Sequence, residues 1–113
     1  MKILILESNV YKQNFISQLF NGVDVLYEPT ITRAINRLGL EQIDFALIDA
    51  DFKKNSYSWE VLAEFLNKME VDFSVFSSSG KVGTVNGHKI IPILDLPKQI
   101  PQPVPQLVPQ LAI

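Results

Sequence analysis

Residues 45–51 read FALIDAD, a short continuous apolar run that ends in two acids. Apolar runs without polar alternation are typical of strands buried on both faces of a parallel sheet. Three more such runs occur at residues 2–6, 23–27 and 72–76. Segments with helical spacing of apolar residues separate the four runs, at residues 10–20, 30–38 and 58–69. This alternation predicts an α/β fold with right-handed crossovers and helices on both faces of a parallel sheet.

The pattern changes after Gly80. Residues 80–89 contain three glycines and lack helical periodicity, and Asn86-Gly87 is a strong signal for a type I′ hairpin turn. Residues 90–94 form a last apolar run, which predicts an edge strand because Pro92 cannot donate to a ladder. Five of the seven prolines lie from Pro97 onward, which favours polyproline II. We therefore divide the chain into a domain at residues 1–98 and a Pro-rich arm at residues 99–113.

Composition excludes several classes of function. The chain of 113 residues has a formal net charge of −2, which argues against electrostatic binding of nucleic acid. It contains no cysteine and one histidine, so disulfide scaffolds and zinc sites built on cysteine or histidine clusters are excluded. No apolar run approaches the length of a membrane span, and the first strand begins too early for a signal peptide. We expect a cytoplasmic domain without membrane insertion.

Polar residues follow the predicted strands where each one ends. Glu7 and Ser8 follow the first strand, Asp49 ends the third, Ser77 follows the fourth, and Lys98 comes after the last apolar run. Functional groups of a doubly wound sheet collect where the carboxyl ends of the strands meet the loops. The sequence therefore predicts one site that contains acids, a hydroxyl and a lysine.

Five segments, taken in order, resemble the receiver domain of two-component response regulators. They read KILILESN, FALIDADF, SWEVL, SVFSSSG and ILDLPK, and the resemblance covers residues 1–98. It implies a flavodoxin-like, doubly wound sheet of five parallel strands in three layers. It also implies that Asp49 accepts a phosphoryl group, that Ser77 contacts this group and relays the switch, and that Lys98 pairs with the phosphorylated site. Glu7, Asp49 and Asp51 would hold Mg²⁺, a hard cation that carboxylates bind.

This sequence also departs from the receiver pattern. Ser8 stands where the family has its second acid, and Pro97 precedes Lys98 where the family has the reverse order. A Gly-rich stretch replaces the fourth helix, and the Pro-rich arm replaces the fifth. A hydroxyl cannot supply the charge of the missing carboxylate, so we expect Mg²⁺ to bind weakly or not at all.

We therefore predict a degenerate receiver, or pseudo-receiver, that is not an enzyme and has no required cofactor. It would bind protein partners in bacterial signal transduction or regulation. The main alternative is a working receiver that a histidine kinase phosphorylates on Asp49 with Mg²⁺. A weaker alternative is a domain that binds a nucleotide or another ligand at the same strand ends, although no Gly-rich phosphate-binding motif supports it.

Simpler interpretations of the same residues stay open. Asp49 would then only end a strand, Glu7 and Asp51 would form a solvated acidic rim, and Lys98 would be a surface lysine. The arm has three interpretations: a linker, a peptide ligand for an aromatic groove, or an ordered arm on its own domain or a second copy. Its apolar residues favour the ordered arm, and exchange of arms between two copies would give a homodimer.

Overall fold

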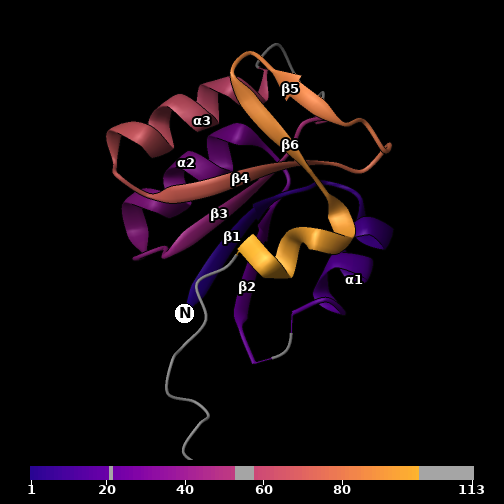
Figure 1. Ribbon diagram of the computed structural model, residues 1–113. Coiled ribbons are helices and arrows are strands. Elements are labelled where there is room, and N and C mark those ends of the chain that lie inside the picture. The colour runs from indigo at the N-terminus through magenta and orange to yellow at the C-terminus, as the bar shows by residue number, and fades with distance from the viewer. Residues whose placement is uncertain (21, 53–57, 100–113) are drawn as a thin grey trace, which may run out of the picture.

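The computed structural model describes residues 1–20, 22–52 and 58–99, which form one sheet with helices on both faces (Figure 1). The sheet has six strands in the order β2-β1-β3-β4-β6-β5. The strands are β1 (Lys2–Leu6), β2 (Asp24–Glu28), β3 (Phe45–Asp49), β4 (Asp72–Ser77), β5 (Gly83–Val85) and β6 (His88–Pro92). The helices are α1 (Val10–Ser17), α2 (Ile31–Leu40), α3 (Trp59–Lys68) and the 3₁₀ helix η1 (Ile93–Gln99).

Two hydrophobic layers enclose the sheet. On one face, Ala34 of α2 and Leu62 of α3 pack against strand residues such as Ile48. On the other face, Ile16 of α1 and Leu96 of η1 pack against residues such as Leu47. Because β1 and β3 are covered on both sides, their residues are apolar without alternation, as the sequence predicts. The five strands β2, β1, β3, β4 and β6 run parallel, which confirms the flavodoxin-like, three-layer architecture.

Polar caps set where two of the helices begin. The Asn9 side chain accepts a hydrogen bond from the backbone N–H of Lys12 at 3.0 Å. The Thr30 side chain accepts one from the backbone N–H of Arg33 at 3.1 Å. Each cap satisfies a backbone donor that has no partner within its helix. These caps fix the first residues of α1 and α2.

The connection from β4 to β6 contains β5 and no helix, and β5 and β6 form a hairpin. Residues 78–87, all of which are described, hold only turns and β5, which confirms the loss of the fourth helix. Asn86 and Gly87 both have positive φ, at 50° and 83°, as a type I′ turn requires. His88 packs edge-on against Trp59 of α3, with ring centroids 5.3 Å apart, and so holds the hairpin to that helix.

Two details of the last strand differ from the sequence prediction. The sheet has six strands instead of five, and β6 is not an edge strand because β5 pairs antiparallel along its outer side. The pairing with β5 ends at Ile90, so Pro92 costs this ladder no hydrogen bond. Residues 93 and 94 belong to η1, which occupies the face expected for the fifth helix. The arm beyond Gln99 lies outside the described residues, as does its predicted packing.

Within the described residues, no helix is both long and apolar enough to cross a bilayer.

Candidate functional site

Buried polar side chains lie where the adjacent parallel strands β1, β3 and β4 end. Asp49 and Ser77 are the last residues of β3 and β4, and Glu7 directly follows β1. The strand register explains this placement, because Leu6 lies opposite Ile48 and Asp49 lies opposite Phe76. Glu7, Asp49 and Ser77 are only 3%, 2% and 4% exposed. Such groups must find hydrogen-bond partners within the protein, and these partners define the chemistry of the site.

Asp49 is hydrogen-bonded by the loop that follows β4. The Ser78 hydroxyl donates to Oδ2 at 2.9 Å, and the backbone N–H of Asp51 donates to Oδ1 at 2.9 Å. The backbone N–H of Ser78 is also directed at Oδ1, at 3.4 Å. Lys12 of α1 donates from Nζ to the same Ser78 hydroxyl at 2.8 Å. Ser78 therefore connects a lysine ammonium to the Asp49 carboxylate, and both carboxylate oxygens are already engaged.

Both carboxylate oxygens of Asp51 also contact donors of the chain. Its Oδ2 accepts hydrogen bonds from the Ser77 hydroxyl at 2.7 Å and the backbone N–H of Ser79 at 2.9 Å. Its Oδ1 lies 3.2 Å from Nζ of Lys81. Burial would raise the pKa of Asp51, but the hydrogen bonds from Ser77, Ser79 and Lys81 outweigh burial and lower the pKa below its usual value. Asp51 is therefore an ionised, fully engaged carboxylate at neutral pH.

The pKa of Glu7 is raised, whereas that of Asp51 is lowered. Burial, followed by the neighbouring Asp49 carboxyl group, raises the pKa of Glu7 to about 7, although the backbone N–H of Asn9 and the charge of Lys12 oppose this shift. Oε2 accepts the hydrogen bond from Asn9 at 3.1 Å, while the buried Oε1 has no donor within the described residues. Two adjacent carboxylates have no hydrogen atom to share unless one is protonated. Burial and the neighbouring carboxyl group therefore make Glu7 easier to protonate than an exposed glutamate.

The residues present do not fit the Mg²⁺ ion that the receiver resemblance implies. Ser8 supplies no charge. The oxygens of Asp51 already accept hydrogen bonds from the loop at residues 77–81, which we call the serine loop, and pair with its Lys81. Within the described ranges, no group of three or more His, Cys, Asp or Glu side chains is placed to hold a metal ion. Mg²⁺ requires near-ideal octahedral oxygen ligation, and the oxygens of Asp49 and Asp51 already accept hydrogen bonds from the chain itself.

The structure does not bring Lys98 to this site. Lys98 lies in the last turn of η1 with its side chain 78% exposed, and its Nζ is 3.6 Å from Oδ1 of Asp95. β6 ends at Pro92, and the chain then turns into η1 instead of continuing along the strand. Two other lysines, Lys12 and Lys81, supply the positive charge.

Three residues of the site are absent from the sequence prediction: Lys12, Ser78 and Lys81. Lys12 occupies the first turn of α1, directly after the Asn9 cap, where its side chain reaches the strand ends. Ser78 and Lys81 follow the Ser77 that was identified, so the run of serines before Gly80 was the available signal. Only the fold shows which of these serines faces which acid.

No protein-family model matches this chain. No curated protein matches it either. A search of solved structures finds the signal receiver domain of a Vibrio parahaemolyticus protein described as a Luxo repressor, at a TM-score of 0.56 and 18% sequence identity. The fold is that of a receiver domain. The match covers 67% of this chain and 58% of the other, so it extends over less than two thirds of the solved domain.

Proposed function

We propose that this receiver-like domain binds protein partners in cytoplasmic signal transduction or regulation in bacteria, without phosphoryl transfer to Asp49. The receiver fold supports a role in signalling. The occupied carboxylates support the absence of phosphoryl transfer, and they are the observation on which the proposal depends. Phosphoryl transfer requires a cation that neutralises the developing charge and a nucleophilic oxygen that the donor can reach. Here Asp49 is 2% exposed, and both of its oxygens accept hydrogen bonds from the chain itself.

Two lysines of the chain itself support the same proposal. Lys12, through Ser78, and Lys81, on Asp51, provide within the chain the positive charge that a metal ion would otherwise supply. The loop at residues 77–81 is therefore fixed on the acids without a ligand. A site of this kind holds one conformation and presents a constant surface to a partner.

Phosphorylation of Asp49 is the alternative, and the position of Asp49 beside Ser77 at the ends of β3 and β4 favours it. Intact-mass measurement after incubation with acetyl phosphate and Mg²⁺ separates the two functions, with Asp49→Asn as the control. We expect no phosphoryl adduct on the natural chain. A stoichiometric adduct that disappears in Asp49→Asn would contradict the proposal.

The binding part of the proposal has a separate test. The natural chain and Asp49→Asn, immobilised side by side, should retain the same proteins from the source cytoplasm, and pretreatment with acetyl phosphate and Mg²⁺ should not change them. Retention that depends on this pretreatment in the natural chain alone would show a working phosphoacceptor. If neither chain retains any protein, the proposed binding function is wrong.

A further inference from the structure

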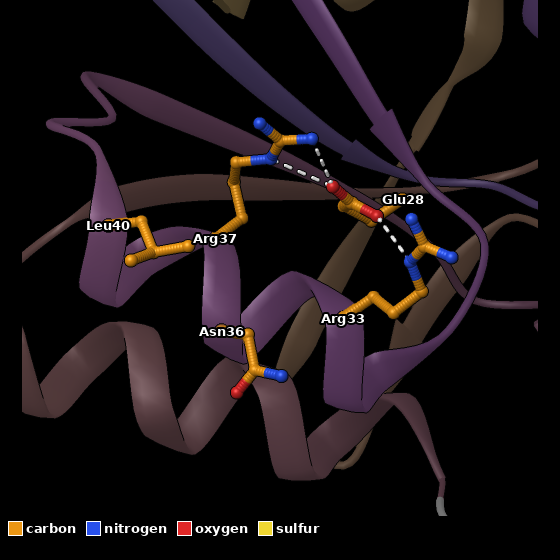
Figure 2. A pocket seen from close by; sticks show the side chains of 5 residues that line it. All are labelled: Glu28, Arg33, Asn36, Arg37 and Leu40. Carbon is orange, nitrogen blue, oxygen red and sulfur yellow. Dashed lines mark hydrogen bonds and ion pairs between the residues drawn. The ribbon is translucent and has the colours of Figure 1, made fainter.

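The outer side of α2 carries two adjoining hollows. The first has a volume of about 240 Å³ and is lined by Glu28, Arg33, Asn36, Arg37 and Leu40 (Figure 2). The second, of about 200 Å³, is lined by Ile31, Thr32, Ile35, Asn36 and Val61. Asn36 lines both hollows, so a charged cavity and a mainly apolar cavity share one rim. We call the two together the α2 surface.

A buried carboxylate builds the charged hollow. Glu28 is 3% exposed, and Arg37 contacts its Oε2 through Nε at 2.8 Å and Nη2 at 2.7 Å. Arg33 contacts Oε1 through Nε at 3.2 Å. Arg37 also contacts Glu41, which in turn pairs with Lys2 at 2.7 Å. Because Glu28 orients both guanidinium groups, their positions are set before any ligand arrives.

Arg33 retains binding capacity in this arrangement. Figure 2 shows only its Nε joined to Glu28, and within the described residues its two terminal nitrogens have no hydrogen-bond or ion-pair partner. Its side chain is 67% exposed. Three cations and two anions take part in the linked ion pairs. The terminal edge of the guanidinium is the edge that binds a carboxylate in a bidentate manner.

The apolar hollow indicates that the ligand is more than a free anion. Ile31 and Ile35 of α2 and Val61 of α3 line it, and Leu40, 82% exposed, lies on the same helix beside Arg37. Apolar side chains next to an oriented arginine are typical of the residues that contribute most to binding at protein interfaces. Each hollow is smaller than the roughly 300–1,000 Å³ of a typical small-molecule pocket, but each is large enough for one side chain.

We propose that the α2 surface docks a protein segment that carries an acidic side chain close to an apolar one. The carboxylate would bind the terminal nitrogens of Arg33, and the apolar side chain would enter the hollow between α2 and α3. This inference rests on the proposed function, since it specifies the chemistry of the partner. It is independent of Asp49, because none of the residues that line the α2 surface belongs to the serine loop or its acids.

An NMR titration of the full chain tests the inference. The probe is a short alanine-based peptide with one Glu and, three positions later, one Leu, a spacing that places both side chains on one face of a helix. We expect saturable shifts in the amides of α2 and in the Nε–H of Arg33. Replacing Glu with Gln or Leu with Ala in the peptide should weaken binding, each by about tenfold. Acetate and inorganic phosphate should bind more weakly than the peptide.

Variants of the chain sharpen the test. Arg33→Gln should weaken binding about tenfold, and Arg33→Lys should recover only part of it because the planar fork is lost. Lys68→Gln, at an exposed cation in the last turn of α3, is the matched control and should change nothing. The inference is wrong if the peptide causes no saturable shift, if Arg33→Gln binds as the natural chain does, or if acetate binds as well as the peptide. None of these outcomes affects the phosphorylation test.

Discussion

Replacing Glu7 with glutamine should remove a large part of the pH dependence of stability near neutrality. In the unfolded chain Glu7 loses its proton near its ordinary pKa of 4.5, whereas in the folded chain the pKa is raised to about 7. Between these values the folded state binds the additional proton, so the free energy of unfolding falls as the pH rises. At about 1.4 kcal/mol per pKa unit, the loss approaches about 3 kcal/mol above the folded pKa.

Glutamine is expected to reverse this loss. It does not titrate, and its amide donates to the neighbouring Asp49 carboxylate, which the buried Oε1 of Glu7 cannot do once it is ionised. The variant should therefore match the natural chain near pH 4.5 and exceed its stability by up to about 3 kcal/mol near pH 8.

Urea unfolding, followed by the fluorescence of Trp59, measures this difference across the pH range. Trp59 is the one tryptophan of the chain and is 5% exposed in the fold, so its emission reports unfolding. Glu64→Gln, at an exposed position of α3, is the control and should keep the natural pH dependence. If Glu7→Gln has the same pH slope as the natural chain, or is less stable near pH 8, then the fold does not raise the pKa of Glu7.

Three further predictions concern two lysines, two glycines and the arm. Lys81→Ala should lower the free energy of unfolding by about 0.5–1 kcal/mol because it removes an ion pair at the site, while Lys98→Ala should cause no measurable change; urea unfolding compares them. Gly39→Ala, in α2 with open space at its Cβ, should raise stability by about 0.5–1 kcal/mol, whereas Gly87→Ala, at a φ of 83°, should lower it by about 1–2 kcal/mol, both measured by urea unfolding. Deleting residues 100–113 should lower the melting temperature if the arm packs on its own domain, and should alter the mass measured by light scattering if it packs on a second copy. An unchanged melting temperature and mass would identify a linker.

Local signals predict much of this fold. Continuous apolar runs locate the buried parallel strands, because a strand covered on both faces has no exposed side to place polar residues. Asn86-Gly87 locates the hairpin turn, because both positions require positive φ. These features depend on neighbours in the sequence, so the sequence is enough to predict them. The parallel pairing of β6 with β4 is longer-range, and the apolar run at residues 90–94 does not show which of its two sides pairs with β4 and which with β5.

The candidate site was predictable in its acids but not in its cations. Glu7, Asp49 and Ser77 end or follow strands, and parallel register brings such residues together. Lysines have long side chains, and which of them reaches the acids depends on the direction of each loop. Lys98 is carried away by η1, whose Pro97 suits a short 3₁₀ helix better than a long α-helix. The clustering of Arg33 and Arg37 on Glu28 depends likewise on how α2 lies against β2.

A Mg²⁺ titration followed by NMR shows whether the chain's own lysines and serines engage the acids in place of a metal. The amides of Ala50, Asp51 and Ser78 report on the site. In the natural chain they should show no saturable shift up to roughly millimolar Mg²⁺, and Ser8→Asp should strengthen whatever binding exists. A saturable shift at or below that concentration, lost in Asp49→Asn, would contradict the account.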